Sequence, residues 1–278
     1  MTDFKIALVG DDGSEKAALA VAWAHELAAR TDLELRALRV TDQDDVAERR
    51  ALTSELEARV CEPARLRGVH ASADVALGDP RDVFLERITD QQADLVVVGD
   101  TGRWGVIRPP LGSLAAHLVH HSPQPVAVVA GAGGPLDGAR LVVGVDGSDD
   151  SRAALAWAAA LAARLGGSVE AVALYDPLAD SYPHGPAASS WHTTLEPMAR
   201  AAVSSVEEPG VPIDLQVFGA QRVEGLLEVG TDGDAAAIVV GARGRGGFRR
   251  LLVGGTALQL LHHADRPVVV VPSHRQIA

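Results

Sequence analysis

The stretch VGDDGS at residues 9–14 recurs 134 positions later as VGVDGS at residues 143–148, and this repeat decides the fold. The same offset, without a gap, pairs Trp23 with Trp157 and the run LAAR at 27–30 with its copy at 161–164. Self-similarity at a fixed spacing is the mark of a duplicated structural unit. The sequence therefore predicts two copies of one domain in tandem.

The spacing between the copies grows to 142 toward the end of each half, where Gly102 matches Gly244 and His121 matches His263. The eight extra residues fall in 177–190, a stretch rich in Pro, Ser, Ala and Gly that we interpret as a loop. The glycine-rich residues 131–135 are interpreted as a short flexible linker. We therefore expect one domain over residues 1–132 and a second over 138–278.

Each copy alternates strand-like and helix-like segments. In the first copy, strands are expected at 4–9, 33–40, 69–77, 95–99 and 126–130, and helices at 13–30, 44–67, 80–91 and 113–121. Ser14 is a plausible cap for the first helix. Strands separated by helices imply a parallel sheet covered on both faces. The predicted fold class is α/β, with two tandem open, parallel-sheet, Rossmann-like domains, and ligands are expected beyond the carboxyl ends of the strands.

Composition limits the function classes. The net charge of −12 argues against a protein that coats nucleic acid, because phosphates would be repelled over most of the surface. No run of apolar residues approaches the length of about 20 that a membrane helix needs. The N-terminus has no secretory signal pattern, and Cys61 is the single cysteine, which suits a reducing compartment. We expect a cytoplasmic protein that binds neither nucleic acid nor membrane.

The candidate site lies in a glycine loop after the fourth strand of each copy. Gly99 and Gly102 are followed after nine residues by Gly112, and Gly241 and Gly244 are followed after nine by Gly254. Glycine lets backbone amides come close to a ligand, and a helix N-terminus behind such a loop attracts phosphate. For one loop, structural turn glycines with solvated arginines would explain the pattern about as well. Two copies at one spacing favour a phosphate site.

The glycine spacing, the end of strand one and the closing valine-rich strand together resemble the universal stress protein family, whose tandem members carry one domain in each half. The resemblance covers nearly the whole chain and implies an adenine-nucleotide fold of the α-hydrolase-like type. It also implies that ATP, with the magnesium ion that it carries, is the ligand. Under this resemblance Asp12 and Asp146 would contact the nucleotide, and Val40 and Leu174 would line the adenine slot. The phosphates would meet the remaining predicted site residues: Gly10, Gly99, Gly102, Arg103, Gly112 and Ser113 in the first copy, and Gly144, Gly241, Arg243, Gly244, Arg245, Gly254, Gly255 and Thr256 in the second.

The two copies depart from the family pattern in different ways. The first has prolines at 109 and 110, which remove two amide donors, and it places Asp100 beside the phosphates. The second has Gly255 at the serine or threonine position, but its loop carries four arginines from Arg243 to Arg250. From these charges alone, the second copy is expected to hold ATP more tightly.

Other side-chain clusters are weaker candidates. Asp11 and Asp12 could bind the magnesium of ATP, although a charged turn that caps the next helix explains them at least as well. His117 and His121 lie four apart on one helical face, but no third metal ligand can be identified. The paired histidines at the ends of the two copies are expected at helix C-termini. We therefore predict neither a resident metal nor a catalytic residue.

The leading hypothesis is an ATP-binding regulatory protein in the stress response, with at most slow hydrolysis, because no general base or lysine is evidently placed for phosphoryl transfer. The alternatives are a nucleotide-free interaction module of the same fold and an enzyme that uses adenylate chemistry. Because the last strand of each copy would expose an apolar edge, we expect the two halves to pair within one chain. A homodimer of two such chains is compatible with this expectation.

Overall fold

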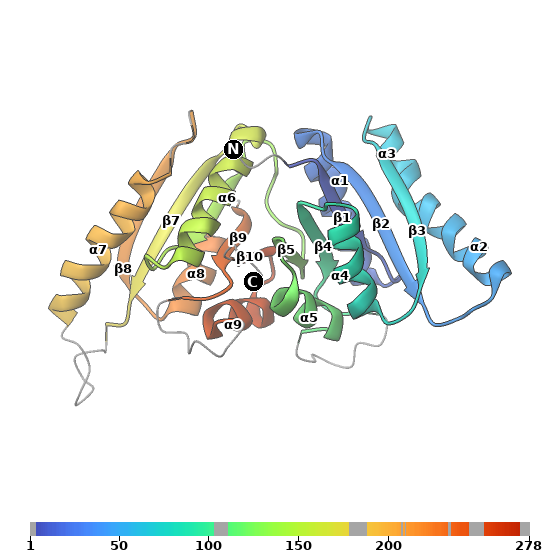
Figure 1. Cartoon of the computed structure of the whole chain (residues 1–278). Helices are drawn as coiled ribbons and strands as arrows, with labels where there is room; N and C mark the ends of the chain where they lie inside the picture. The colour runs from blue at the N-terminus through green and yellow to red at the C-terminus, as the bar shows by residue number, and fades with distance from the viewer. Residues whose placement is uncertain are drawn as a thin grey trace. The chain divides into compact units, whose positions relative to one another are not determined.

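The computed structural model describes residues 4–102, 111–177, 188–206, 208, 210–232, 235–244 and 253–272. It divides into two units, Met1–Ala132 and Gly133–Ala278. Each unit is an α/β domain (Figure 1), and its described residues form five strands. Of the predicted site residues, Arg103 and Arg245 lie outside the described residues, as do the prolines at 109 and 110.

The first unit contains a parallel sheet in the order β3-β2-β1-β4-β5. Its strands are β1 (Ile6–Gly10), β2 (Glu34–Thr41), β3 (Ala71–Leu77), β4 (Leu95–Gly99) and β5 (Val126–Val129). Its helices are α1 (Glu15–Thr31), α2 (Val46–Leu56), η1 (Glu57–Cys61), α3 (Glu62–Leu66), α4 (Pro80–Asp90) and α5 (Ser113–His121). Helix α1 and the α2–η1–α3 stretch cover one face of the sheet, and α4 and α5 cover the other (Figure 1).

The second unit repeats this plan with the parallel order β8-β7-β6-β9-β10. Its strands are β6 (Arg140–Gly144), β7 (Ser168–Tyr175), β8 (Ile213–Gly219), β9 (Ala235–Gly241) and β10 (Val268–Val271). Its helices are α6 (Asp149–Leu165), α7 (Ala188–Ser204), α8 (Arg222–Thr231) and α9 (Gly255–His263). The predicted α/β class with a parallel sheet is confirmed in both halves.

The central strands are buried because helices cover both faces of each sheet. In β4 the run Leu95–Val98 is nearly inaccessible, and Val126–Val129 of β5 is equally buried. Such continuous apolar runs are typical of parallel strands. Trp23 and Trp157, expected in the core, expose only 6% and 4% of their surface. None of the described helices is long and apolar enough to cross a membrane.

Helix starts explain much of the agreement between sequence and structure. Ser14 accepts a hydrogen bond from the amide of Ala17, as predicted for the cap of α1, and Ser148 caps α6 in the same way. Asp45 and Asp79 cap α2 and α4. These side chains satisfy amides that the first helical turn leaves unpaired.

Two expected boundaries were wrong. The single helix predicted over 44–67 is interrupted by the π-helical turn η1, which a periodicity analysis cannot detect because one inserted residue leaves the pattern nearly intact. The loop predicted through residue 190 ends earlier, since α7 begins at Ala188. Residues 178–187 of that loop lie outside the described part of the chain.

In each sheet the strand order reverses at one point. In the first unit β1 lies between β2 and β4, so the strand order reverses beside β1. The chain leaves β1 and β4 at the same edge of the sheet, which brings residues 10–14 next to residues 99–102. In open parallel sheets this reversal is where ligands bind.

Candidate functional site

Asp12 and Gly102 meet where β1 and β4 end. A β-carbon built on Gly102 would lie 2.8 Å from Oδ2 of Asp12, so only glycine leaves this carboxylate its position. In the second unit, the corresponding distance from Gly244 to Oδ2 of Asp146 is 2.5 Å. The structure thus brings together the aspartate and the second glycine of the loop in both halves, as the shared edge of the sheet predicts.

The first glycine of each loop has a packing role that the sequence did not reveal. A β-carbon on Gly99 would lie 2.9 Å from the carbonyl carbon of Lys16, in the first turn of α1. A β-carbon on Gly241 would lie 2.6 Å from the carbonyl carbon of Asp150, in the first turn of α6. These glycines let a helix backbone cross the strand end closely, so their missing side chains make room for protein rather than for phosphate.

Gly10 and Gly144 likewise face the protein interior. A β-carbon on Gly10 would meet the ring of Phe84 at 2.9 Å, and one on Gly144 would lie 3.2 Å from Leu226 and from Val240. Their missing side chains therefore serve the packing of α4 and α8 against the sheet.

The helices that follow the glycine loops begin without a side-chain cap. Gly112 is the N-cap of α5 and Gly254 that of α9, and neither helix shows a side-chain hydrogen bond at its start. Each cap amide is fixed by the loop, with Gly112 donating to the Asp100 carbonyl at 2.7 Å and Gly254 donating to the Ala242 carbonyl at 2.7 Å. Within the part of the chain that the structure describes, no side chain caps the next amides of either helix, whose end carries the positive pole of the helix dipole.

The residues that open these helices differ between the units. Ser113, the first residue of α5, is exposed, so its hydroxyl can reach a ligand. Its counterpart Gly255 is also exposed, and nothing lies within 4 Å of a β-carbon built there. Thr256, the next residue, is half-buried. The first unit therefore offers a hydroxyl at a position where the second leaves open space.

An ion pair lies beside each loop, but the residue that the helix contributes is basic in the first unit and acidic in the second. In the first, Lys16 of α1 lies 3.3 Å from the Asp100 carboxylate and donates to the Ala130 carbonyl at 2.7 Å. In the second, the equivalent helix position is Asp150, which accepts from Nε of Arg243 at 3.1 Å and from its backbone amide at 3.0 Å. Asp150 is buried. Arg243, predicted to meet phosphate, is thus held by a carboxylate of its own unit.

This pairing changes the charge comparison on which the expected ranking of the sites rested. Lys16 adds a positive charge beside the first loop, and Asp150 adds a negative one beside the second. The lysine was not foreseen as a neighbour of the loop, because it lies 83 positions before Gly99 in the chain. The contrast between the two loops is therefore smaller than their own residues suggest.

A buried ion cluster next to the first site was also missed. The side chain of Asp11 has no exposed surface, and its carboxylate accepts from Arg59 at 2.7 and 3.1 Å and from Arg39 at 3.2 Å. Arg39 also donates to the Asp11 carbonyl at 2.8 Å and pairs with Glu55 at 3.0 Å. The amide of Gly13 donates to the same carboxylate at 2.8 Å. Asp11 therefore fixes the loop that carries Asp12, and its carboxylate is surrounded by donors of the protein itself.

The second unit has no such cluster at the equivalent positions, where Val145 and Ala173 are buried apolar residues. The side chain of Asp11 pairs with residues 28 and 48 positions away, so sequence spacing alone could not have joined them. The one available signal was the difference between Asp11 and Val145 in otherwise matching stretches.

The structure shows which way the side chains of Val40 and Leu174 point, while their predicted role at the adenine slot stays a prediction. The side chain of Leu174 packs toward Gly225 of α8, where a β-carbon would lie 2.8 Å from Cδ1 of Leu174. Strand alternation turns Val40 to the same face as Arg36, which reaches the Gln91 carbonyl at the end of α4. Their side chains therefore face α8 and α4, and only their backbones can line a slot beside the loops.

The backbones of Val40 and Leu174 can be placed relative to the ends of β1 and β6. The Leu38 carbonyl accepts from the Asp11 amide across the end of β1, and Val172 does the same for Val145 in the second unit. Two residues further on, the N–H and C=O groups of Val40 and Leu174 face the same side of their strands. At that level β1 and β6 have ended, at Gly10 and Gly144, so no described strand pairs with these groups on that side.

The two histidines of α5 lie close together, and the cysteine is buried. The rings of His117 and His121 lie 4.4 Å apart between centroids, and burial followed by the neighbouring His121 lowers the pKa of His117. Among the described residues, no group of three or more His, Cys, Asp or Glu side chains could hold a metal ion. Cys61 is buried, and burial raises the pKa of its thiol, so it is poorly suited to act as a nucleophile.

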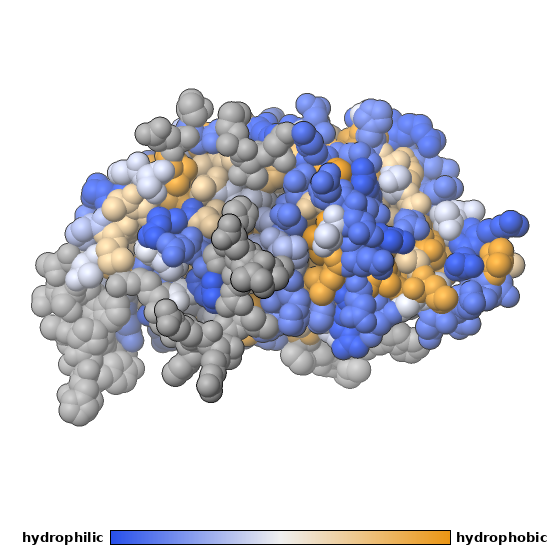
Figure 2. Space-filling view, viewed as in Figure 1, coloured by the Kyte–Doolittle hydropathy of each residue, from blue (hydrophilic) through white to orange (hydrophobic). Residues whose placement is uncertain are grey.

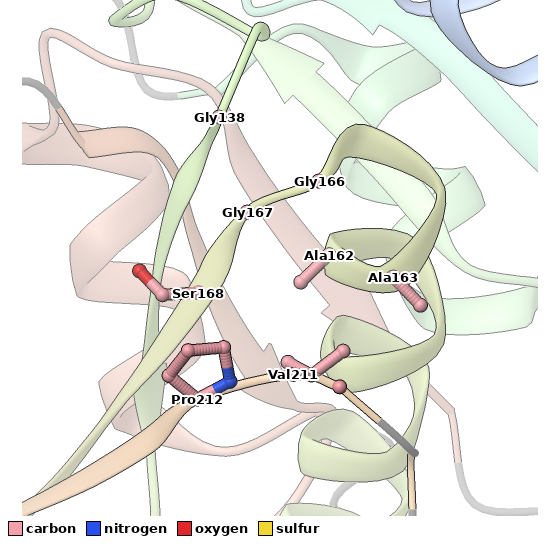
Figure 3. Close-up of a pocket in the computed structure, with 9 residues that line it drawn as sticks. Gly138, Ala162, Ala163, Gly166, Gly167, Ser168, Val211 and Pro212 are labelled. Atoms are coloured by element: carbon pink, nitrogen blue, oxygen red, sulfur yellow. The ribbon is translucent and has the colours of Figure 1, made fainter.

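A cavity of about 360 Å³ in the second unit lies away from the glycine loops (Figure 3). It is formed where α6 ends and where β6, β7 and β8 begin, so it lies at the amino ends of the strands. Glycine, alanine, serine, valine and proline line it, as Ala162, Ser168 and Pro212 illustrate (Figure 3). Such a lining offers no charged group to orient a nucleotide.

Comparison with known proteins identifies similar sequences along nearly the whole chain. The model of the universal stress protein family matches residues 3–130 and again residues 139–272. A universal stress protein of Mycolicibacterium smegmatis is 33% identical over 185 residues, which are 65% of this chain and 62% of that protein. The chain thus spans less than two thirds of that relative. A universal stress protein of Mycobacterium tuberculosis is 27% identical over 285 residues, covering 95% of both chains.

Solved structures show the same architecture. The crystal structure of a universal stress protein from Archaeoglobus fulgidus superposes with a TM-score of 0.69 at 18% identity, covering 96% of each chain. A structure described as a putative universal stress protein from Pseudomonas aeruginosa gives 0.69 at 17% identity, covering 98% of this chain and 95% of the other. These likenesses show the shared fold.

Proposed function

Because the chain belongs to the universal stress protein family, with one family domain in each half, we propose that it binds ATP at two sites. One site lies at the carboxyl ends of β1 and β4, and the other at those of β6 and β9. Nucleotide occupancy would then regulate a role in the stress response. The observation that carries this proposal is found in both halves: a close approach of an aspartate to a loop glycine, beside a helix N-terminus that no described side chain caps.

The phosphates would be held by the start of α5 or α9. In the first unit the Ser113 hydroxyl and the free amides of the first turn supply donors, and in the second the amides act together with Thr256. An anion at a helix N-terminus is stabilised by about 0.3–1 kcal/mol through the dipole, and hydrogen bonds to a charged group add about 1.5–3 kcal/mol each. Magnesium would arrive with the nucleotide and neutralise part of its charge. Asp12 and Asp146 are the carboxylates placed near it.

The base would read the backbone of Val40 or Leu174 rather than their side chains. An N–H and a C=O of one residue, facing the same side, match an adjacent acceptor and donor on the edge of adenine. Guanine presents the opposite arrangement on that edge, so we expect ATP to be preferred over GTP at both sites.

Hydrolysis would be slow at most. The lysine nearest to the first loop, Lys16, is held by the Ala130 carbonyl and the Asp100 carboxylate. In the second unit, Arg243 of the described part of the loop is held by Asp150. Phosphoryl transfer needs cations positioned on the transferred group and an oriented nucleophile. Among the described residues, Lys16 and Arg243 are committed to carboxylates, which favours binding and regulation over turnover.

The two sites should differ less in affinity than the loop charges alone suggest. Asp150 offsets one of the loop arginines, and Lys16 offsets Asp100. The hydroxyl of Ser113 further favours the first unit, whereas the second keeps the larger number of arginines. We therefore expect both sites to bind ATP with affinities within about tenfold of each other, or about 1.4 kcal/mol.

Titration calorimetry of the full chain with ATP and with GTP tests the proposed function. Tighter binding of ATP supports the adenine assignment, and equal affinity for both nucleotides contradicts it. Binding of neither nucleotide would favour the interaction module without nucleotide. Rapid release of pyrophosphate from ATP would instead favour adenylate chemistry. Intramolecular pairing of the halves stays a prediction from the family resemblance.

A further inference from the structure

A groove of about 320 Å³ lies in the first unit between α1 and the η1–α3 stretch, outside the nucleotide site. Its apolar lining comes from Ala18, Val21 and Ala22 of α1 and from Pro63 of α3. Its volume is at the small end of the range for ligand pockets, about 300–1,000 Å³. It fits a compact molecule with an apolar body.

Two arginines give the groove a cationic side. Arg59 lines it with a side chain that is 31% exposed, and bonds Asp11 through Nε and Nη2. Within residues 4–102, which are described without a gap, no hydrogen-bond partner is found for Nη1 of Arg59. Arg67 lines the same groove, and the one hydrogen bond that its side chain makes in this range is from Nη1 to the Pro63 carbonyl. Both guanidinium groups therefore keep N–H donors for an anion, and carboxylates are the anions that such forks bind well.

The same groove contains an acceptor of hydrogen bonds. Nε2 of His25 lies 2.8 Å from the Val60 carbonyl, and because a carbonyl only accepts, Nε2 must carry the proton. Burial lowers the pKa of His25, so the ring stays neutral near pH 7 and its Nδ1 is an acceptor. Glu26 adds a carboxylate at the rim. A ligand that complements this side needs a hydroxyl or an amine.

We propose that this groove binds a small organic acid that carries a hydroxyl or amino group and a compact apolar body. The carboxylate of the ligand would bind Arg59 and Arg67, its hydroxyl or amine would donate to His25 or Glu26, and its apolar part would cover the alanines of α1. The second unit lacks this chemistry, because the residue equivalent to His25 is Ala159. The site is therefore a property of the first unit.

Arg59 connects this groove to the nucleotide loop. The guanidinium that lines the groove also holds Asp11, the residue next to Asp12. It sits on a π-helical turn, a feature that occurs frequently at functional sites. A carboxylate on the free Nη1 edge would restrain Arg59 in the orientation that already holds Asp11. This coupling, which rests on the proposed function, should raise the ATP affinity of the first unit, and ATP should raise the affinity for the acid equally.

Calorimetry of the full chain without nucleotide tests the groove directly. The probes are 2-hydroxyisocaproate, isocaproate (which lacks the hydroxyl) and 2-hydroxyisocaproamide (which lacks the charge). The hydroxy acid should bind at least about tenfold more tightly than either analogue. Equal binding of the three probes, or no binding of the hydroxy acid, would overturn the proposed ligand class.

Three variants locate the binding. Arg67→Gln removes a cation without touching the Asp11 cluster, and Ala22→Leu fills the groove from an exposed helical position. Each should weaken the hydroxy acid at least about tenfold. Arg50→Gln, an exposed arginine of α2 with the same change in charge, is the matched control and should leave binding unchanged. Binding that survives both groove variants would overturn the site.

The coupling is measured separately in the Gly244→Val chain, in which the second nucleotide site is blocked. Saturating hydroxy acid should raise its ATP affinity at least about threefold. An unchanged affinity would overturn the coupling. If this chain binds the acid but no ATP, the coupling and the proposed function of the first unit are both wrong. The groove site, measured without nucleotide, would still stand.

Discussion

Replacing Asp11 by valine removes the centre of the buried ion cluster beside the first nucleotide loop. The change copies the second unit, where Val145 occupies the equivalent position and is 4% exposed. If the charges of the cluster depend on one another, Asp11→Val should lower the stability of the first unit. This should hold although the second unit naturally carries valine at the equivalent position.

The size of the effect follows from the burial of the two arginines. The side chain of Arg59 is 31% exposed and can turn toward water after Asp11 is lost. The side chain of Arg39 is only 4% exposed and would keep Glu55, itself 47% exposed, as its remaining carboxylate. Breaking a buried pair by removing one partner costs about 3–5 kcal/mol. We expect the free energy of unfolding of the first unit to fall by about that amount.

A second change should reverse most of this loss. Arg39→Met keeps a long side chain of similar shape but removes the buried charge. Replacing a whole buried ion pair by apolar residues is often neutral or stabilising. The double variant Asp11→Val, Arg39→Met should therefore unfold within about 1–2 kcal/mol of the unchanged chain.

Hydrogen–deuterium exchange of the full chain measures the first unit on its own, since the amides of β1 and β2 report its opening. A loss of about 3–5 kcal/mol raises the exchange rate of their most protected amides by a factor of about one hundred or more. Peptides from β6 and β7 serve as the internal control and should not change. A single variant that exchanges like the unchanged chain, or a double variant no better than the single, would refute the cluster as described.

Three further predictions concern glycines and pH. Gly241→Ala should destabilise the second unit by about 1–3 kcal/mol, because its β-carbon would collide with the backbone of Asp150. Gly255→Ala places a methyl group in open space and should leave the stability unchanged. Urea unfolding of both variants measures the difference. Gly255→Ser should raise the ATP affinity of the second site about fivefold or more by restoring a hydroxyl, and calorimetry in a Gly102→Val background that shows no gain would contradict it. Because burial lowers the pKa of His25, the unfolded chain takes up a proton that the folded chain does not, so stability should fall as the pH drops below about 6.5. His25→Gln, which can still donate to the Val60 carbonyl, should reduce this slope in thermal melts, and an unchanged slope would contradict the assignment.

The fold could be predicted from the sequence because its signals are local and appear twice. Strand lengths, the Ser14 cap and the Pro80 start of α4 depend on neighbours within a few residues, and the structure confirms them. The glycine loops could be placed for the same reason, since the carboxyl ends of parallel strands share one edge of the sheet. The contact between Asp12 and Gly102 follows from that arrangement.

The parts that were missed depend on tertiary contacts between distant residues. The cluster around Asp11 joins three elements, and the pairing of Asp150 with Arg243 spans 93 positions. The role of Gly99 is set by how closely α1 crosses β4, which no local pattern encodes. The packing of the Leu174 side chain toward Gly225 of α8 is likewise a tertiary contact that no local pattern encodes.

Native mass spectrometry of the full chain with ATP tests the central claim of two nucleotide sites most directly. The unchanged chain should bind two ATP molecules, Gly102→Val and Gly244→Val should each bind one, and the double variant should bind none. Valine at these glycines displaces Asp12 or Asp146, whose carboxylates lie within 3 Å of the added β-carbon. Thermal melts show that each variant is folded before it is counted. A folded double variant that binds ATP as the unchanged chain does, or an unchanged chain that binds none, would contradict the account.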